Sequence, residues 1–294
     1  MTATVKAALA AAALTLNAFV YGVSWWPFRE LQAYGVHPMW ATAIIYCLAL
    51  LCLTAFQPRA WHGFVKHPAL WWLVLAAGLT NIGFNWAVTL GDVVRAVLLF
   101  YLMPAWVVLL AWPMLGEKPT RGALLRLGLA LTGVVIVLKT PTSPWPVPES
   151  LPDWMALMAG FSFALTNILL RKLNHTPGES RMLAMFGGGA VVAIIAALLG
   201  MGLGIVNALP SPQFSWVALA LLVSGAFLVA NLALQYGAGR LSASATSLIM
   251  LSEVVFASVS SVVLGTAELS TRTLLGGALI LLASLLSVLS FGKR

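Results

Sequence analysis

The sequence predicts an all-α integral membrane protein, with ten transmembrane helices arranged as two inverted five-helix repeats around a central cavity. Two observations lead to this fold class. First, the 294-residue chain is 61% hydrophobic and only 8% charged, with a mean hydropathy of +0.97, whereas about a quarter of the residues in soluble domains are charged. Second, a short motif occurs twice, about half a chain length apart. The composition indicates a membrane protein, and the repetition indicates a duplicated unit.

Ten apolar segments are long enough to be transmembrane helices. A helix needs roughly 20 mainly apolar residues to cross the hydrocarbon core. Clusters of charge, proline and glycine mark where the segments end. The predicted segments are 7–26, 38–56, 69–91, 93–114, 122–139, 153–172, 182–206, 214–238, 241–264 and 272–291. We expect the first to be retained as a helix, not cleaved as a signal peptide, because its apolar run continues into aromatic residues.

The segments form two groups of five. Closely spaced prolines between residues 140 and 152 preclude a regular helix there. The predicted domains are therefore a first five-helix repeat over 1–139, a proline-rich linker over 140–152, and a second, inverted repeat over 153–294.

The duplicated motif is Glu-x-x-Thr-Arg, which begins at Glu117 and again at Glu268, each time between two apolar segments. Before each copy, an asparagine stands six residues ahead of a glycine that closes an apolar run, as Asn85 with Gly91 and Asn231 with Gly237. A duplicated membrane unit without a nucleotide-binding motif is typical of a secondary transporter.

The charges in the predicted loops orient the chain. If the N-terminus is cytoplasmic, twelve of the sixteen lysines and arginines lie inside, and Arg29, Arg95, Lys139 and Arg272 lie outside. The positive-inside rule favours this arrangement. We therefore expect a multi-pass protein of the bacterial inner membrane with both termini in the cytoplasm. Because each half has five helices, an odd number, the second half would begin on the opposite side of the membrane from the first. It would therefore be inverted relative to the first half.

Several classes of function are excluded. The net charge of +8 is spread over the loops and forms no single basic stripe, so no nucleic acid is expected and contact with membrane lipids accounts for the charge. The chain has no GxxxxGK[ST], HExxH or CxxC motif, and its four histidines all lie in predicted loops. We expect no enzyme activity, cofactor, metal site or ATPase subunit. The expected partner is a small-molecule substrate; a monomer is expected, with dimerisation left open.

Glu253 stands out as a candidate binding residue. It lies about twelve residues into the ninth segment, near the bilayer centre, where a carboxylate costs at least ~2.5 kcal/mol. One interpretation is a counter-charge for a substrate ammonium group, or a group that couples transport to protons. The other is a protonated or paired carboxyl group that braces two helices, and both interpretations stay open.

Amide side chains within the apolar segments form a second group of candidates: Asn17, Asn81, Asn85, Asn167, Asn231 and Gln235. An amide carries both donors and an acceptor, so it can bind the carboxylate or ammonium group of an amino acid. It can equally hydrogen-bond to a neighbouring helix. For any single asparagine the structural role is favoured.

Aromatic residues supply the remaining candidates. Tyr101 lies deep in the fourth segment, where its hydroxyl group needs a partner. Pro104 removes a helical hydrogen bond, so a kink is expected there, and we favour Tyr101 as a residue that lines a cavity, with Met103 beside it. Phe163 lies four residues before Asn167, on the same helix face. Tryptophans near segment ends are expected to anchor at the membrane interface: Trp25, Trp26, Trp61, Trp71, Trp72, Trp145, Trp154 and Trp216.

The order and duplication of these motifs resemble the EamA-type branch of the drug/metabolite transporter superfamily, over essentially the whole chain. The first half fits best, with Tyr101-Leu102-Met103-Pro104 followed by Gly116-Glu117. The resemblance implies an inner-membrane exporter of amino acids, aromatic or otherwise hydrophobic, and of related metabolites, that works by alternating access. Efflux of cationic drugs or other small metabolites is the alternative.

Within this superfamily, the Tyr-Leu-x-Pro stretch is similar to that of exporters of aromatic amino acids. This similarity implies that Tyr101, Met103 and Phe163 surround the central cavity. Met103, Phe163 and Asn17 stand where the resemblance would place tryptophan, so the substrate preference stays open. Glu253 is followed by Val254 and not by proline, so the ninth helix is expected to be straighter than the fourth.

Overall fold

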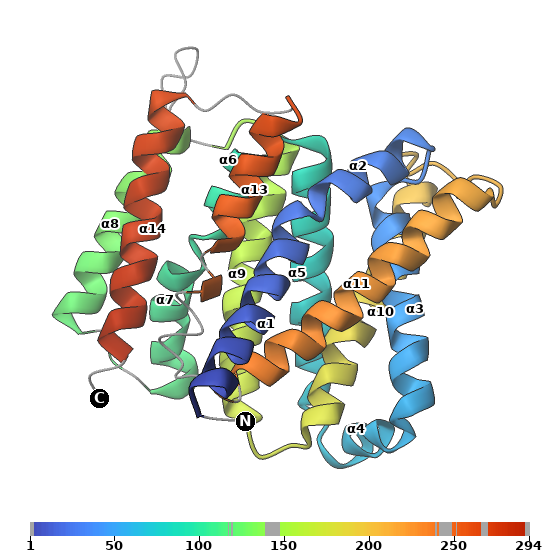
Figure 1. Ribbon diagram of the computed structural model, residues 1–294, viewed down its shortest axis with the longest axis horizontal. Coiled ribbons are helices and arrows are strands. Elements are labelled where there is room, and N and C mark those ends of the chain that lie inside the picture. The colour runs from blue at the N-terminus through green and yellow to red at the C-terminus, as the bar shows by residue number, and fades with distance from the viewer. Residues whose placement is uncertain are drawn as a thin grey trace.

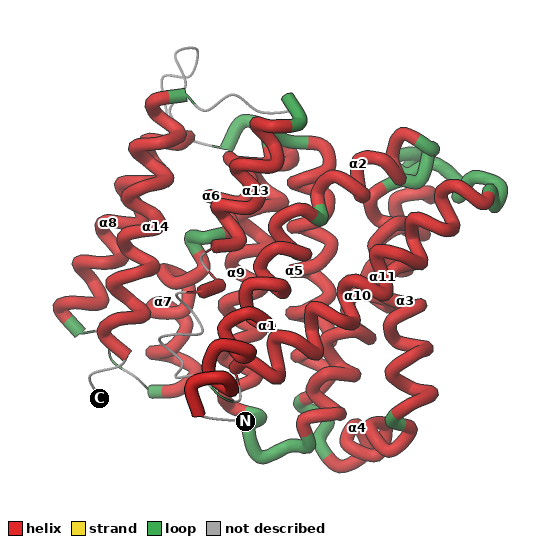
Figure 2. The backbone as a smooth tube through the Cα atoms, in the orientation of Figure 1, coloured by secondary structure: helices red, strands yellow, loops and turns green. Residues whose placement is uncertain are grey.

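The computed structural model describes residues 3–116, 118, 120–138, 148–238, 240, 249–250, 252–265 and 270–291. In these ranges every regular element is a helix (Figure 2). Seven stretches are long and apolar enough to cross a membrane, which confirms the predicted helical membrane class. Glu117, Glu268, most of the predicted linker and residues 241–248 of the ninth segment lie outside the described residues.

The helices follow one another along the chain as Figure 1 shows. The first half contains α1 (Ala3–Val23), α2 (Trp25–Ala33), α3 (Pro38–Phe56), the 3-10 helix η1 (Pro58–Trp61), α4 (His62–Lys66), α5 (Leu70–Leu90), α6 (Val93–Phe100), α7 (Met103–Leu115) and α8 (Arg121–Leu138). The second half contains α9 (Leu151–Lys172), α10 (Gly178–Gly202), α11 (Phe214–Ala238), α13 (Ser252–Val263) and α14 (Thr271–Phe291).

Local sequence signals explain where several of these helices begin and end. At the start of α9, Ser150 caps the first turn by accepting a hydrogen bond from the Asp153 amide at 3.3 Å, and Pro152 occupies a first-turn position. Arg171 and Lys172 lie in the last turn of the same helix, where the helix dipole favours positive charge. Gly116 ends α7 with a φ of 72°, a left-handed conformation that favours glycine.

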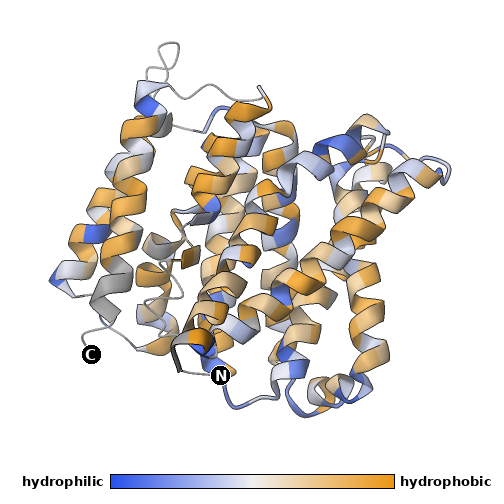
Figure 3. Ribbon diagram, viewed as in Figure 1, coloured by the Kyte–Doolittle hydropathy of each residue, from blue (hydrophilic) through white to orange (hydrophobic). Residues whose placement is uncertain are grey.

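The long helices lie roughly along one direction. Helix α1 begins, and α14 ends, at the same end of the molecule (Figure 1). At one edge α8 packs against α14, and at the other α3 packs against α10. Hydrophobic residues dominate the long helices, while hydrophilic residues gather mainly towards their ends and in α2 (Figure 3).

The two glycines of the duplicated Asn-Gly motif make corresponding contacts. A Cβ atom on Gly91, at the end of α5, would lie 2.6 Å from the Cβ of Pro152 in α9. A Cβ atom on Gly237, in α11, would lie 2.8 Å from the Ala10 carbonyl oxygen in α1. In each half, therefore, the helix that carries the motif packs against the first long helix of the other half, and only glycine permits the observed approach.

The interpretation of Trp25 and Trp216 as interface anchors is wrong. Trp25 is only 2% exposed and Trp216 only 4%. Each indole N–H donates to an acceptor within the protein, in Trp25 to the Ser260 hydroxyl and in Trp216 to the carbonyl oxygen of Ser211 in the loop before α11. Trp26, Trp61, Trp71, Trp72 and Trp154 are exposed, as expected, and Trp145 lies outside the described residues.

Candidate functional site

The fourth predicted segment is interrupted at the position of the expected kink. Helix α6 ends at Phe100 and α7 begins at Met103, with Pro104 in its first turn. Tyr101 and Leu102 form the turn between the two helices. Because proline lacks an amide hydrogen and fixes φ, it suits the start of a helix better than its interior. The sequence thus places Tyr101 in the break between the two helices, and the turn sets the direction of its side chain.

Tyr101 connects the two halves of the chain. Its hydroxyl oxygen lies 3.2 Å from Oε2 of Glu253 and 3.3 Å from the Met250 carbonyl oxygen, so it can donate to either acceptor. Both side chains are buried, Tyr101 being 3% and Glu253 9% exposed. Within the described residues the Glu253 carboxylate has no other hydrogen bond and no ion pair with a basic residue. A buried acid with a single neutral partner keeps capacity for a further donor.

Phenylalanines surround this break. The Phe100 ring lies 4.8 Å from the Phe84 ring and 5.4 Å from the Phe163 ring, measured between centroids, and Phe100 also contacts Tyr101 edge-on at 5.7 Å. Helix α9 comes close enough for these contacts because it carries Gly160, whose Cβ position would lie only 2.6 Å from the Phe100 carbonyl oxygen. The result is an aromatic cluster of the hydrophobic core beside the Tyr101–Glu253 contact.

Three of the six amide candidates bind other helices. In α5, Asn81 Oδ1 accepts a hydrogen bond from the Tyr46 hydroxyl at 2.7 Å, and the Asn85 amide donates to the Thr42 hydroxyl at 3.1 Å. Both bonds join α5 to α3. The Asn17 amide of α1 donates to the Ala230 carbonyl oxygen of α11 at 2.7 Å, while its buried Oδ1 has no partner among the described residues.

The remaining candidates lie on α9, α11 and α7. Asn167 is half-buried on α9 and makes no hydrogen bond within the described part of the chain. Asn231 is half-buried on α11, and the Gln235 side chain lies outside the described residues. Met103 is half-buried and packs against the hydrophobic core around the α6–α7 break. The structure therefore brings Tyr101, Met103, Phe163 and Glu253 into one region.

Two tyrosines that sequence reasoning missed pack against the Phe227 ring. Tyr46 is 5% exposed and contacts the Phe227 ring at 5.9 Å, in addition to its bond with Asn81. Tyr21 stacks on the same Phe227 ring at 4.8 Å and is close enough to Glu253 to interact electrostatically with it. The depth argument that selected Tyr101 also applies to Tyr46, which lies well inside its predicted segment.

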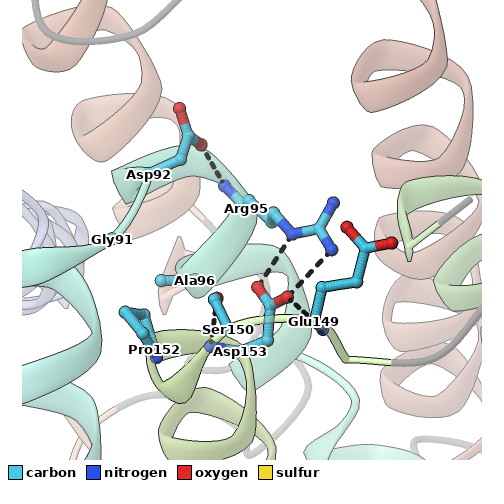
Figure 4. A pocket seen from close by; sticks show the side chains of 8 residues that line it. All are labelled: Gly91, Asp92, Arg95, Ala96, Glu149, Ser150, Pro152 and Asp153. Atoms are coloured by element: carbon cyan, nitrogen blue, oxygen red, sulfur yellow. Dashed lines mark hydrogen bonds and ion pairs between the residues drawn. The ribbon is translucent and has the colours of Figure 1, made fainter. Parts of the chain in front are cut away.

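A separate pocket of about 270 Å3 lies at the end of the molecule where α5 meets α6 (Figure 4). Its lining residues are Gly91, Asp92, Arg95, Ala96, Glu149, Ser150, Pro152 and Asp153. Arg95 forms a two-pronged ion pair with Asp153, with distances of 2.8 and 2.9 Å. None of the predicted site residues lines this pocket, so we place the candidate site at the α6–α7 break.

Comparisons with known proteins agree with this architecture. The model of the EamA-like transporter family matches the chain twice, over residues 8–139 and 150–289. The protein RarD of Streptomyces exfoliatus is 25% identical over 243 residues, which is 74% of each chain. One solved crystal structure shares the fold with a TM-score of 0.61 and 17% identity, over 97% of this chain and 99% of the other. With its helical membrane fold and two family matches that together span most of its length, the chain belongs to the EamA-like transporter family.

Proposed function

We propose that the protein is a secondary transporter that exports amino acids, preferentially aromatic or hydrophobic ones, from the bacterial cytoplasm. The observation that carries the proposal is the contact between Tyr101 and Glu253, which joins the two halves of the chain beside a cluster of phenylalanine rings. An ammonium group would bind the Glu253 carboxylate, and an apolar side chain would pack against Phe100 and Phe163. An intramembrane acid is a functional group by default.

Alternating access between two inverted five-helix repeats is the proposed mechanism. The double match to one family model supports a repeat, and the corresponding packing of Gly91 and Gly237 against the opposite half supports a pseudo-twofold relation between the halves. Such a pair of repeats opens to one side or the other by exchanging the conformations of its halves. Helix α1 begins and α14 ends at the same end of the molecule, which supports a location of both termini in the cytoplasm.

Efflux of cationic drugs is a second candidate. It is favoured by one observation, the lack of a basic partner for Glu253 among the described residues. An uncompensated carboxylate attracts any cation that fits, whether or not the cation also carries a carboxylate. An amino acid needs a second group to bind its own carboxylate, and the half-buried amide of Asn167 is the side chain proposed for that role.

Transport by purified protein in liposomes separates these candidates. Liposomes are loaded with unlabelled phenylalanine, threonine or tetraphenylphosphonium, and the uptake of the labelled compound by counterflow is measured with and without a pH gradient. The proposal predicts that phenylalanine exchanges faster than threonine, and that Glu253→Gln abolishes the exchange. Exchange of tetraphenylphosphonium alone would favour drug efflux, and no amino acid flux above that of empty liposomes would refute the proposal.

Flux with Asn167→Ala tests how the substrate carboxylate is bound. We expect this variant to lose phenylalanine exchange while any exchange of a carboxylate-free cation is retained. Asn85→Ala serves as the matched control for amide loss, because its amide already bonds to Thr42 in the helix packing. Equal losses for both substrates with Asn167→Ala would contradict a carboxylate-binding role.

A further inference from the structure

Helix α2 is a short segment that turns away from α1. The turn lies at Ser24, whose hydroxyl donates to the Tyr21 carbonyl oxygen at 2.7 Å. Figure 1 places α2 at the end of the molecule opposite the start of α1. It contacts α5, α3 and α11, so it crosses the end of the helix bundle and does not simply extend α1.

One side of α2 is fixed to the second half of the chain. The Trp25 indole N–H donates to the Ser260 hydroxyl of α13 at 2.9 Å. Just before the turn, α1 itself lies close to α13, because a Cβ on Gly22 would be 2.8 Å from the Glu253 carbonyl oxygen. Helix α1 therefore packs directly on α13, and a part-buried hydrogen bond joins α2 to α13.

The other side of α2 is tied to the first half by Arg29. Its Nε donates to the Val88 carbonyl oxygen at 3.3 Å and its Nη2 to the Gly91 carbonyl oxygen at 2.6 Å. These carbonyl groups lie at the end of α5, where a helix has no amide donors of its own to offer. The guanidinium also lies 5.1 Å from the Trp25 ring centroid and interacts electrostatically with Asp92.

We propose that Arg29 is a gate latch, which holds closed the end of the transport path opposite the termini and releases α5 when that end opens. The proposal rests on the alternating access proposed above. Arginine suits this role because its fixed fork spans two carbonyl groups at once. The Arg29 guanidinium and the carbonyl groups of α5 lie at the end of the molecule, where water can replace the broken hydrogen bonds. Opening therefore leaves neither the donor nor the acceptors without a partner.

The turn at Ser24 and the difference between the two sets of hydrogen bonds define how the helices would move. The bond of Trp25 and the bonds of Arg29 join different helices. The Trp25–Ser260 bond stays within the unit formed by α1, α2 and α13, whereas the Arg29 bonds cross from that unit to α5. Opening at this end therefore requires the Arg29 bonds to break and allows the Trp25 bond to persist. Removing the guanidinium should raise the population of the open state without loosening the rest of the fold.

Cysteine labelling in detergent tests the latch without any substrate. Cys47 and Cys52 are free cysteines, so both are first replaced by alanine. The reporter is Val88→Cys, at a position 1% exposed beside the latch, and the reference is Val74→Cys, 7% exposed nearer the start of the same helix. The rate of reaction with a hydrophilic maleimide measures how often each buried site opens.

In Arg29→Ala we expect the labelling rate of the Val88→Cys reporter to rise about ten-fold, with the Val74→Cys reference unchanged. Arg29→Lys should give an intermediate rate, because an ammonium group does not match the fork. Arg59→Ala, which removes an exposed arginine from η1, should leave both rates unchanged. If Arg29→Ala does not elute as a monodisperse peak, the labelling rates of Arg29→Lys are used for the test instead.

No rise at the Val88→Cys reporter, or an equal rise at the Val74→Cys reference, would overturn the latch, since the second result indicates general loosening. The outcome is separable from the proposed function. Labelling that behaves as expected in a protein that moves no amino acid would refute the substrate assignment and leave the latch standing.

Discussion

Replacement of Gly160 by alanine tests the packing that holds the candidate site together. The new Cβ would lie 2.6 Å from the Phe100 carbonyl oxygen and 3.3 Å from the Phe100 Cα. Ordinary contact distances between heavy atoms are about 3.5–4.0 Å, and the atoms that would have to yield belong to the backbone. Helix α9 must therefore move several tenths of an ångström away from the α6–α7 break. Overpacking of this kind costs about 1–3 kcal/mol.

The assay for Gly160→Ala is thermal unfolding in detergent, followed by tryptophan fluorescence. At roughly 2–4 °C per kcal/mol, the expected fall in melting temperature is about 2–12 °C. Phenylalanine exchange should fall as well, because Phe163 and Tyr101 are displaced relative to each other. The matched control is Gly128→Ala in α8, where a Cβ would meet no atom within 4 Å, and where alanine is favoured by up to ~1 kcal/mol. Equal melting temperatures for the two variants would refute the steric reasoning.

Two further predictions concern stability at the helix ends. Asp153→Asn keeps the shape of the side chain but removes the charge that binds Arg95; because both groups are partly buried, we expect a loss of about 1–2 kcal/mol, measured as a lower melting temperature. Burial lowers the pKa of His37 below its ordinary value of 6.5, and its neutral Nδ1 accepts a hydrogen bond from the Met39 amide. Its contribution to stability is therefore present above pH 6.5 and is lost as the pH falls through that value towards the lower pKa of the folded state. The melting temperature should fall between pH 7.5 and pH 5, and His37→Asn, which can cap without titrating, should reduce that fall; identical pH profiles would contradict this assignment.

Helix positions were largely predictable because each depends on a local run of apolar residues. The segment 38–56 coincides with α3, and the segment 69–91 differs from α5 by one residue at each end. The break at Tyr101 was also predictable, since it follows from the missing amide hydrogen of Pro104. These features are encoded within a few residues of where they appear.

The partners of polar side chains were not predictable, because they depend on residues far away in the sequence. Arg29 appeared only as one of the charges outside the membrane, yet it bonds to the end of α5, about 60 residues later. Trp25 lies near a segment end, as an interface anchor would, but its partner is Ser260. Local pattern gives the position of such a residue, and only tertiary packing decides what it contacts.

The same limit applies to the candidate site. The depth of Glu253 in its segment marked it as costly to bury, but nothing local identified Tyr101 as its neighbour. The asparagines carry identical chemistry, so sequence alone could not separate Asn81 and Asn85, which bond to α3, from Asn167, which makes no hydrogen bond within the described residues.

The most direct test of transport through the Tyr101–Glu253 contact is phenylalanine counterflow by Tyr101→Phe in proteoliposomes. This change removes one hydroxyl group and leaves the ring in place. Tyr236→Phe is the control, because Tyr236 is half-buried near the end of α11 and lies against the Arg240 guanidinium. We predict that Tyr101→Phe lowers the exchange rate about ten-fold or more, as expected for the loss of a hydrogen bond to a charged group, and that Tyr236→Phe matches the unmodified protein. Unchanged exchange by Tyr101→Phe, with equal protein incorporated, would contradict the proposed site.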